Sequence, residues 1–129
     1  MKEVIQIELN FRINMLKRSR NRLKKEDTVL RRCQILLEQL DRLVSSRAIA
    51  VWLMKNYQEI LNYIPITHEN KFNACAMEYF KLVSKLTGPL VVDGSSMSIA
   101  SIMAILPRNE MLVTQISENG YELRFRKDS

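Results

Sequence analysis

The chain has 129 residues and a mass of 15.1 kDa, which suits one domain, or a helical domain with a small appendage. Hydrophobic residues make up 47%, enough for a core, while only three glycines and three prolines argue against low complexity or a turn-rich β protein. No run approaches the ~20 apolar residues that a membrane span requires, so we expect no membrane segment.

The net charge of +6 is concentrated in one segment. Residues 12–32 hold nine basic side chains against two acidic ones, a local net charge of +7, whereas the ten basic and ten acidic residues from position 33 onward cancel. Such a patch can meet DNA, an acidic protein surface or only water. The residues that we expect to form a patch for DNA or an acidic partner are Arg18, Arg20, Arg22, Lys24 and Lys25.

The first segment fits either a strand or a helix. Apolar and polar residues alternate strictly over positions 5–15, as in a half-buried strand. The same segment contains Val4, Ile7, Phe11 and Met15, which form a helical stripe. Because no glycine or proline interrupts the following residues, we favour a helix that runs to about Lys25.

Two more helices are predicted before residue 88. Asp27 and Thr28 are suited to cap a long helix with apolar residues every three or four positions, which Pro65 ends. Thr67 is suited to cap the next helix, and Gly88, followed by proline, marks its end. The apolar stripe of this last helix consists of Phe72, Cys75, Ala76, Tyr79, Phe80, Val83 and Leu86.

Beyond residue 88 the pattern changes to a small mixed unit. Val91 and Val92 predict a strand before an Asp-Gly turn, and residues 96–106 fit a strand or a helix. Pro107 predicts a short helix over about residues 108–116, and Asn119-Gly120 a turn into a terminal strand. We therefore expect a mainly α fold, with a helical domain of three helices in residues 1–88 and a small α+β domain in residues 89–129.

No constellation of residues marks an enzyme. The one histidine, His68, lies at a predicted helix start, and nothing nearby marks a nucleophile for it to activate. The Asp93-Gly94 turn lacks the glycine spacing and the lysine of a phosphate-binding loop. Cys33 and Cys75 occupy apolar-stripe positions, typical of buried free thiols, and with one histidine they cannot form a tetrahedral metal site. We expect neither catalysis nor a metal or cofactor.

Binding is the class of function that remains. Several arginines interrupt a predicted helix that is otherwise rich in apolar residues, and arginine suits the partly buried, bidentate ion pairs of subunit contacts. The alternative is an exposed face opposite the apolar stripe. The one tryptophan, Trp52, is expected in the core or, as a second choice, as an interface anchor. The predicted subunit-interface residues are Arg31, Arg32, Asp41, Arg42, Arg47 and Trp52.

Two groups of motifs follow one another along the chain. The first is Arg31-Arg32-Cys33, then Leu40-Asp41-Arg42-Leu43, Arg47-Ala48 and Trp52. The second is Asp93-Gly94-Ser95, then Leu106-Pro107-Arg108 and Gly120. In this order they resemble the GINS family of replication proteins, and most closely its Psf-one branch.

This resemblance implies a non-catalytic subunit in the nucleus, in a heterotetramer of related subunits whose helical domains pack together. It implies further partners in the Mcm helicase ring, its RecJ-like companion and the leading-strand polymerase. It adds Tyr79 and Phe80 to the subunit interface. It also implies a C-terminal docking module that contains Asp93, Gly94, Leu106, Pro107, Arg108 and Gly120. Two alternatives stay open: a stand-alone basic helical nucleic-acid-binding protein, and a viral or organellar helical protein–protein adaptor.

Overall fold

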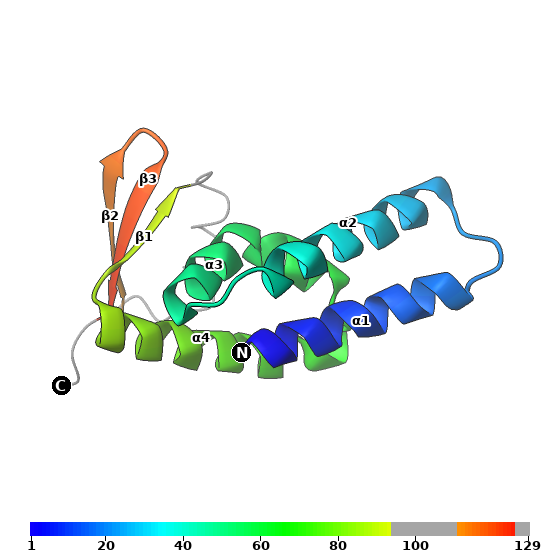
Figure 1. Cartoon of the computed structure of the whole chain (residues 1–129), viewed down its shortest axis with the longest axis horizontal. Coiled ribbons are helices and arrows are strands. Elements are labelled where there is room, and N and C mark those ends of the chain that lie inside the picture. Colours follow the sequence, from blue (N-terminus) through cyan, green and yellow to red (C-terminus); the bar gives the residue numbers. More distant parts are fainter. Residues whose placement is uncertain (94–110, 126–129) are drawn as a thin grey trace.

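The computed structural model describes residues 1–93 and 111–125, which form four helices followed by a three-stranded antiparallel sheet (Figure 1). The helices are α1 (Lys2–Arg18), α2 (Lys24–Asp41), α3 (Ser46–Tyr63) and α4 (Ile66–Thr87). The strands are β1 (Leu90–Asp93), β2 (Met111–Ser117) and β3 (Gly120–Phe125). The mainly helical fold is confirmed, although residues 1–88 form four helices where the sequence predicted three.

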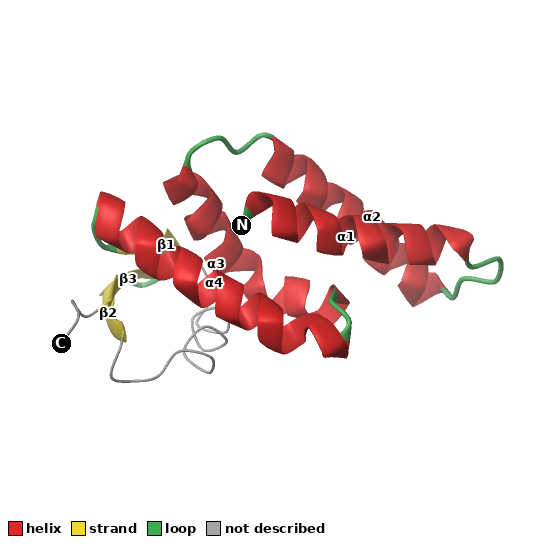
Figure 2. Ribbon diagram, turned by 90° about the horizontal axis from the view of Figure 1, so that it is seen from below, coloured by secondary structure: helices red, strands yellow, loops and turns green. Residues whose placement is uncertain are grey.

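The molecule is elongated, with a helical hairpin at one end and the sheet at the other. Helices α1 and α2 form the hairpin, and its tip projects beyond α3 and α4 (Figure 1). Seen from below, the sheet lies beside the C-terminal end of α4, far from the hairpin tip (Figure 2). The two ends therefore present separate surfaces.

Helix α1 confirms the helical alternative for the first segment, but it ends at Arg18 rather than near Lys25. Its core face consists of Ile5, Leu9, Ile13 and Leu16. The stripe that we predicted from Val4, Ile7, Phe11 and Met15 lies on the other side, where the last three residues are exposed. On a helix, alternate residues are 200° apart, so an alternating apolar pattern produces two opposite apolar faces.

The single long helix predicted between Thr28 and Pro65 is wrong, because the chain breaks between α2 and α3. The break has a local cause in Ser45, whose side-chain Oγ accepts a hydrogen bond of 3.1 Å from the N–H of Ala48 and so caps α3. Helix α2 also begins earlier than expected, at Lys24, where the carboxylate of Glu26 accepts from the N–H of Leu23.

Helix α4 begins at Ile66, so the predicted cap Thr67 lies inside the helix, and Pro65 occupies the capping position. Its end is as predicted, because Gly88 has a φ of +85°, a region that side chains with a Cβ rarely adopt. The predicted stripe is partly confirmed. Phe72, Ala76, Phe80 and Val83 are buried, whereas Leu86 is exposed.

The sheet has the order β1-β3-β2, with β3 in the middle. Strand β3 pairs Leu123 with Leu90 of β1 and with Val113 of β2. The terminal strand and the strand before residue 94 are thus confirmed, whereas the short helix predicted over residues 108–116 is wrong from Met111 onward. The turn at residues 118–119 lets β2 satisfy its backbone groups by pairing with β3 instead of within a helix.

One hydrophobic core joins the helices to the sheet. It extends from Ile5 of α1 through Leu53 of α3 and Phe80 of α4 to Leu90 and Leu123 of the sheet. Leu90 and Leu123 have no exposed surface. The division into domains at residue 88 stays a prediction, and any such division would cut through this shared core.

Candidate functional site

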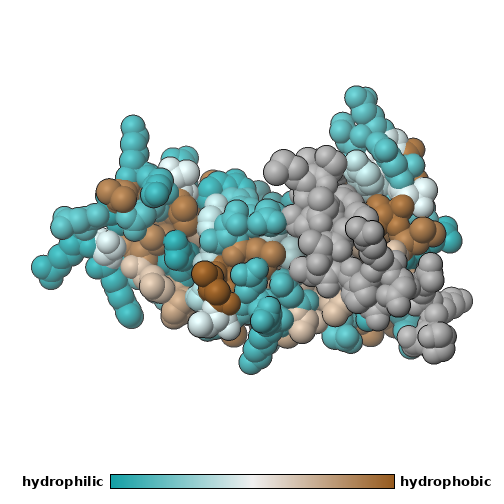
Figure 3. Space-filling view, turned by 180° about the vertical axis from the view of Figure 1, so that it is seen from behind, coloured by the Kyte–Doolittle hydropathy of each residue, from teal (hydrophilic) through white to brown (hydrophobic). Residues whose placement is uncertain are grey.

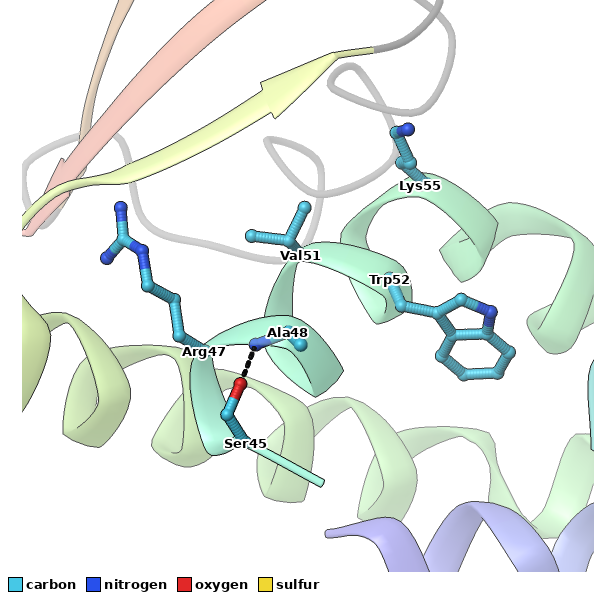
Figure 4. Close-up of a pocket in the computed structure, with 6 residues that line it drawn as sticks. All are labelled: Ser45, Arg47, Ala48, Val51, Trp52 and Lys55. Atoms are coloured by element: carbon cyan, nitrogen blue, oxygen red, sulfur yellow. Dashed lines mark hydrogen bonds between the residues drawn. The ribbon is translucent and has the colours of Figure 1, made fainter. Parts of the chain in front are cut away.

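Two of the predicted interface residues, Arg47 and Trp52, line one groove on helix α3. Ser45, Arg47, Ala48, Val51, Trp52 and Lys55 line a shallow groove of about 470 Å³ on its outer side (Figure 4). The side chains of Arg47 and Trp52 point in different directions. In the close-up, the guanidinium of Arg47 points toward β1, whereas the indole of Trp52 points along the helix, away from the sheet.

Trp52 is half-buried, and one hydrogen bond fixes the orientation of its indole ring. Its indole Nε1 donates a hydrogen bond of 3.0 Å to Oε1 of Gln39 on α2. The polar edge is thus satisfied inside the chain, while the half-buried residue also lines the groove. A large aromatic side chain held in one orientation loses little conformational entropy when a partner covers it, which is why tryptophan is frequent among interface anchors.

Arg47 ties helix α3 to the junction between α4 and the sheet. Its Nη2 donates to the carbonyl oxygen of Pro89 at 2.7 Å, and its Nη1 donates to Oγ1 of Thr87 at 2.9 Å. Weaker contacts of Nη1 reach the carbonyl oxygens of Thr87 and Gly88 at 3.3 and 3.5 Å. A guanidinium at this position satisfies carbonyl groups that the helix end leaves unpaired and complements the negative end of the helix dipole.

Arg32 joins α2 to α3 through a bidentate ion pair. Its Nε and Nη2 each donate to a carboxylate oxygen of Glu59 at 2.8 Å, and the Tyr63 hydroxyl donates to the same carboxylate at 2.7 Å. The hydrogen bonds that Arg32 donates to Glu59 lower the pKa of Glu59 and raise the pKa of Arg32. Burial, followed by the hydrogen bond to Glu59, raises the pKa of Tyr63. Arg32 thus has its carboxylate partner within the chain.

Asp41 lies where α1 meets the end of α2. Its Oδ1 accepts a hydrogen bond of 2.8 Å from Nε2 of Gln6, and its carbonyl oxygen accepts from Nζ of Lys2 at 3.4 Å. Lys2 also donates to the carbonyl oxygen of Leu43 at 2.6 Å. These contacts attach the start of α1 to the loop before α3. The neighbouring Arg42 is exposed, as is Arg31 farther back on α2.

The two aromatic residues predicted at a subunit interface have different environments. Phe80 has no exposed surface and packs with Tyr57, their ring centroids 6.2 Å apart, so it belongs to the core of this chain. Tyr79 is half-buried, and its hydroxyl donates to the carbonyl oxygen of Ser46 at 3.0 Å. Burial raises the pKa of Tyr79. Of the two, only Tyr79 has surface to offer a partner.

The five predicted patch residues gather at the tip of the hairpin, across the end of α1, the connecting loop and the start of α2. Figure 3 shows hydrophilic side chains extending outward at this end, with hydrophobic surface between them. Arg22 is tied down, because its Nε donates to Asp27 at 2.7 Å and its Nη1 to the carbonyl oxygen of Leu16 at 3.1 Å. Leu23 is 60% exposed beside it.

Four of the six predicted docking residues lie outside the part of the chain that the structure describes. Gly94, Leu106, Pro107 and Arg108 lie outside the described residues, and only the backbone of Asp93 is described, at the end of β1. Gly120 is buried at the start of β3, where it pairs with Asp93.

A second groove was not expected from the sequence. It lies between the start of α1 and α4, has a volume of about 590 Å³, and is lined by Met1, Val4, Ala74, Cys75, Glu78, Tyr79 and Leu82. The exposed apolar residues Ile7, Phe11 and Met15 continue from this groove along α1. The alternating pattern of α1 was the available signal, because on a helix it requires a second apolar face.

The two cysteines differ in exposure. Cys33 is buried, and burial raises the pKa of its thiol to about 11, whereas Cys75 is half-buried in the second groove. Within the described ranges, no helix combines the length and apolar character needed to cross a membrane.

The chain was compared with known proteins. No family model, curated protein or solved structure matches it.

Proposed function

We propose that this chain is a non-catalytic subunit of a hetero-oligomeric protein assembly and, on the strength of its motifs, a GINS-like subunit in nuclear DNA replication. The observation that carries the proposal is the groove on α3, which Arg47 and Trp52 line together. Tryptophan and arginine are the residue types most enriched among binding hot spots. The proposed occupant of this groove is a helix of a sister subunit.

The internal bonds of both residues support this role. Trp52 is held by Gln39, and Arg47 is held by the carbonyl groups at the end of α4, so the groove is formed before a partner arrives. Preorganised side chains lose less conformational freedom on binding, which raises affinity. The GINS assignment rests on the motif resemblance alone, and with it the proposed contacts to the Mcm ring, its RecJ-like companion and the polymerase.

The test has two parts. Tagged protein purified from its native host should bring down sister subunits and, at lower yield, the replicative helicase. Trp52→Ala should reduce recovery of the sister subunits at least tenfold, because truncation of a hot-spot residue costs about 2 kcal/mol or more. Ile66→Ala is the matched control, since Ile66 is an exposed apolar residue outside this groove.

The outcomes separate the two levels of the proposal. Recovery of a stable complex of unrelated proteins that depends on Trp52 would keep the assembly role and reject the GINS assignment. The groove on α3 would be rejected as the binding surface if the protein were recovered alone. It would also be rejected if neither Trp52→Ala nor Ile66→Ala reduced the recovery of the complex.

The hairpin tip favours a second candidate function, binding of a nucleic acid. The structure brings Arg18, Arg20, Lys24 and Lys25 to one projecting end, as a phosphate-binding surface requires. No aromatic residue lies among them in the sequence, so we expect contact with the phosphate backbone rather than stacking on bases.

Salt dependence tests this candidate. If the tip binds DNA, the affinity should fall steeply with salt, and Arg20→Glu with Lys24→Glu should flatten the slope by about one counterion per lost contact. Lys71→Glu, an exposed charge reversal on α4, serves as the control. If the wild type, the double variant and Lys71→Glu show the same dependence of DNA affinity on salt, the tip serves solubility or binds an acidic protein partner.

A further inference from the structure

Helix α1 exposes an apolar stripe directly opposite its core face. Ile7, Phe11 and Met15 are 67%, 45% and 50% exposed, and they follow one another at intervals of four residues. On a helix this interval places the three side chains on one line. Isolated exposed apolar residues are common, but a continuous line of three large ones indicates a docking surface.

Helix α4 flanks only the first half of this stripe. The ring of His68, near the start of α4, lies 6.2 Å from the ring of Phe11, and its Nδ1 is 3.0 Å from a carboxylate oxygen of Glu8. From there α4 runs antiparallel to α1, and the groove between them is lined by Val4 on one side and by Leu82 on the other. Beyond Phe11, α1 extends past α4 toward the hairpin tip (Figure 1). The stripe therefore has two halves. The grooved half, from Val4 to Phe11, borders the groove, and the projecting half, from Phe11 to Arg18, lies on the part of α1 that extends past α4.

The exposed charges of α1 differ in sign between the two halves. Glu3 in the first turn of α1 is exposed, and Glu78 lines the groove. The last turn of α1 carries Lys17 and Arg18, both exposed. On α1 itself, the grooved half thus exposes an acidic side chain and the projecting half exposes basic ones, whereas the same face of α4 carries the exposed Lys71 and Lys85 beside Glu78.

We propose that this surface binds a second copy of the chain, with the two α1 helices packed antiparallel around a two-fold axis at Phe11. The spacing of the stripe is symmetric about that residue. Ile7 lies four positions before it and Met15 four after, so each Ile7 faces the partner's Met15. Val4 lies seven positions before it and Arg18 seven after, so the partner's Arg18 faces Val4 and lies within reach of the neighbouring Glu3.

A two-fold axis makes each contact occur twice, so a surface must be complementary to itself to form such a dimer. Here the projecting half of one chain seats in the grooved half of the other. Glu3 meets the partner's Arg18 at both ends, the side chains of Ile7, Phe11 and Met15 meet their counterparts, and the antiparallel helix dipoles are favourably aligned. Because the contact is essentially one helix pair, we expect a dimer that dissociates on dilution.

This inference goes beyond the proposed function and uses a different surface from the groove on α3. The test is the oligomeric state of the full chain, followed by analytical ultracentrifugation over a range of concentrations. The wild type should dimerise as the concentration rises. Phe11→Ser should weaken the dimer by about 30-fold or more, because it removes the central apolar residue from both chains. Leu112→Ser, on the sheet, is the matched control and should leave the dimer unchanged.

A charge exchange makes the arrangement specific. Glu3→Lys and Arg18→Glu should each weaken self-association about tenfold, because each places like charges together at both ends of the contact. A mixture of the two variants should dimerise as well as the wild type, since every pair in the mixed dimer again joins opposite charges. A chain that had merely lost its fold would not recover in the mixture.

Two results would overturn the proposal. One is a wild-type chain that stays monomeric at every concentration, which would leave the stripe to a partner other than itself. The other is a dimer that Phe11→Ser leaves intact, which would place the contact elsewhere. Trp52→Ala should not change the dimer, so a failure of the proposed function and a failure of this inference give different results.

Discussion

Arginine serves different purposes at the centre of the molecule and at the hairpin tip. At the centre, Arg32 is bound to Glu59, and Arg47 is bound to the end of α4, so both join elements of the fold. At the tip, Arg22 bonds within the hairpin to Asp27 and Leu16, whereas Arg18 and Arg20 are exposed. In the sequence these residues look alike. What distinguishes them is whether the fold brings a carboxylate or free carbonyl group within reach.

The largest loss of stability should come from a substitution in the hydrophobic core. Phe80→Ala removes a fully buried ring and should lower the free energy of unfolding by about 3–5 kcal/mol. Leu82→Ala, two residues along and 54% exposed, is the control and should change it by about 0.5 kcal/mol or less. Denaturant unfolding measures both. Similar losses would mean that Phe80 is not a core residue.

Arg47→Ala should have the next largest effect. It leaves the carbonyl of Pro89 and the end of α4 without their donor, which should cost about 1–2 kcal/mol. Because those bonds hold the junction to β1, hydrogen exchange should accelerate in β1 and β3 before it does in α2. Arg42→Ala, which removes an exposed arginine side chain, is the control. Uniform acceleration through the whole chain would show that Arg47 does not act at this junction.

The ion pair between Arg32 and Glu59 should contribute less, about 1 kcal/mol, because solvent screens a pair whose side chains are 39% and 28% exposed. The folded pKa of Glu59 lies below its ordinary value of 4.5, so this stabilisation is present above that value and is lost as the pH falls through the folded pKa. Glu59→Gln should therefore reduce the acid sensitivity of unfolding. Glu78→Gln, on the exposed side of α4, tests whether the effect is specific.

Charge reversal at the tip should have the smallest effect on stability. Arg20→Glu with Lys24→Glu should change the free energy of unfolding by about 0.5 kcal/mol or less, because both side chains are exposed. A loss comparable to that of Arg47→Ala would erase the difference between the centre and the tip. Thermal melting in moderate salt is the appropriate measurement.

The helical character of the chain could be predicted from periodicity and from strong end signals. Gly88 with the following proline marked the end of α4, and the alternation after Asn119 marked β3. The break between α2 and α3 was missed because the apolar pattern continues across it. Ser45 was the signal, but a serine within a helical pattern caps a helix only if the chain turns there.

The interactions of the predicted site residues could not be predicted from the sequence. Arg32 and its partner Glu59 are separated by 27 positions, and Arg47 meets carbonyl groups about 40 positions away. Such pairs depend on how the helices pack. The second face of α1 was missed for another reason. The sequence analysis identified only one helical stripe, from Val4 to Met15, although the alternating pattern implied two faces.

Residues 5–15 suit a β-strand as well as a helix, so we expect α1 to keep its conformation only while its core face is packed against the other helices. In an isolated peptide, such an alternating segment is prone to pair with its own copies into cross-β fibres. In the whole chain, α2 follows directly and packs along α1, and contacts between neighbours in sequence form quickly. We therefore expect the hairpin to form early during synthesis and to keep this segment from aggregating before the rest of the protein is complete.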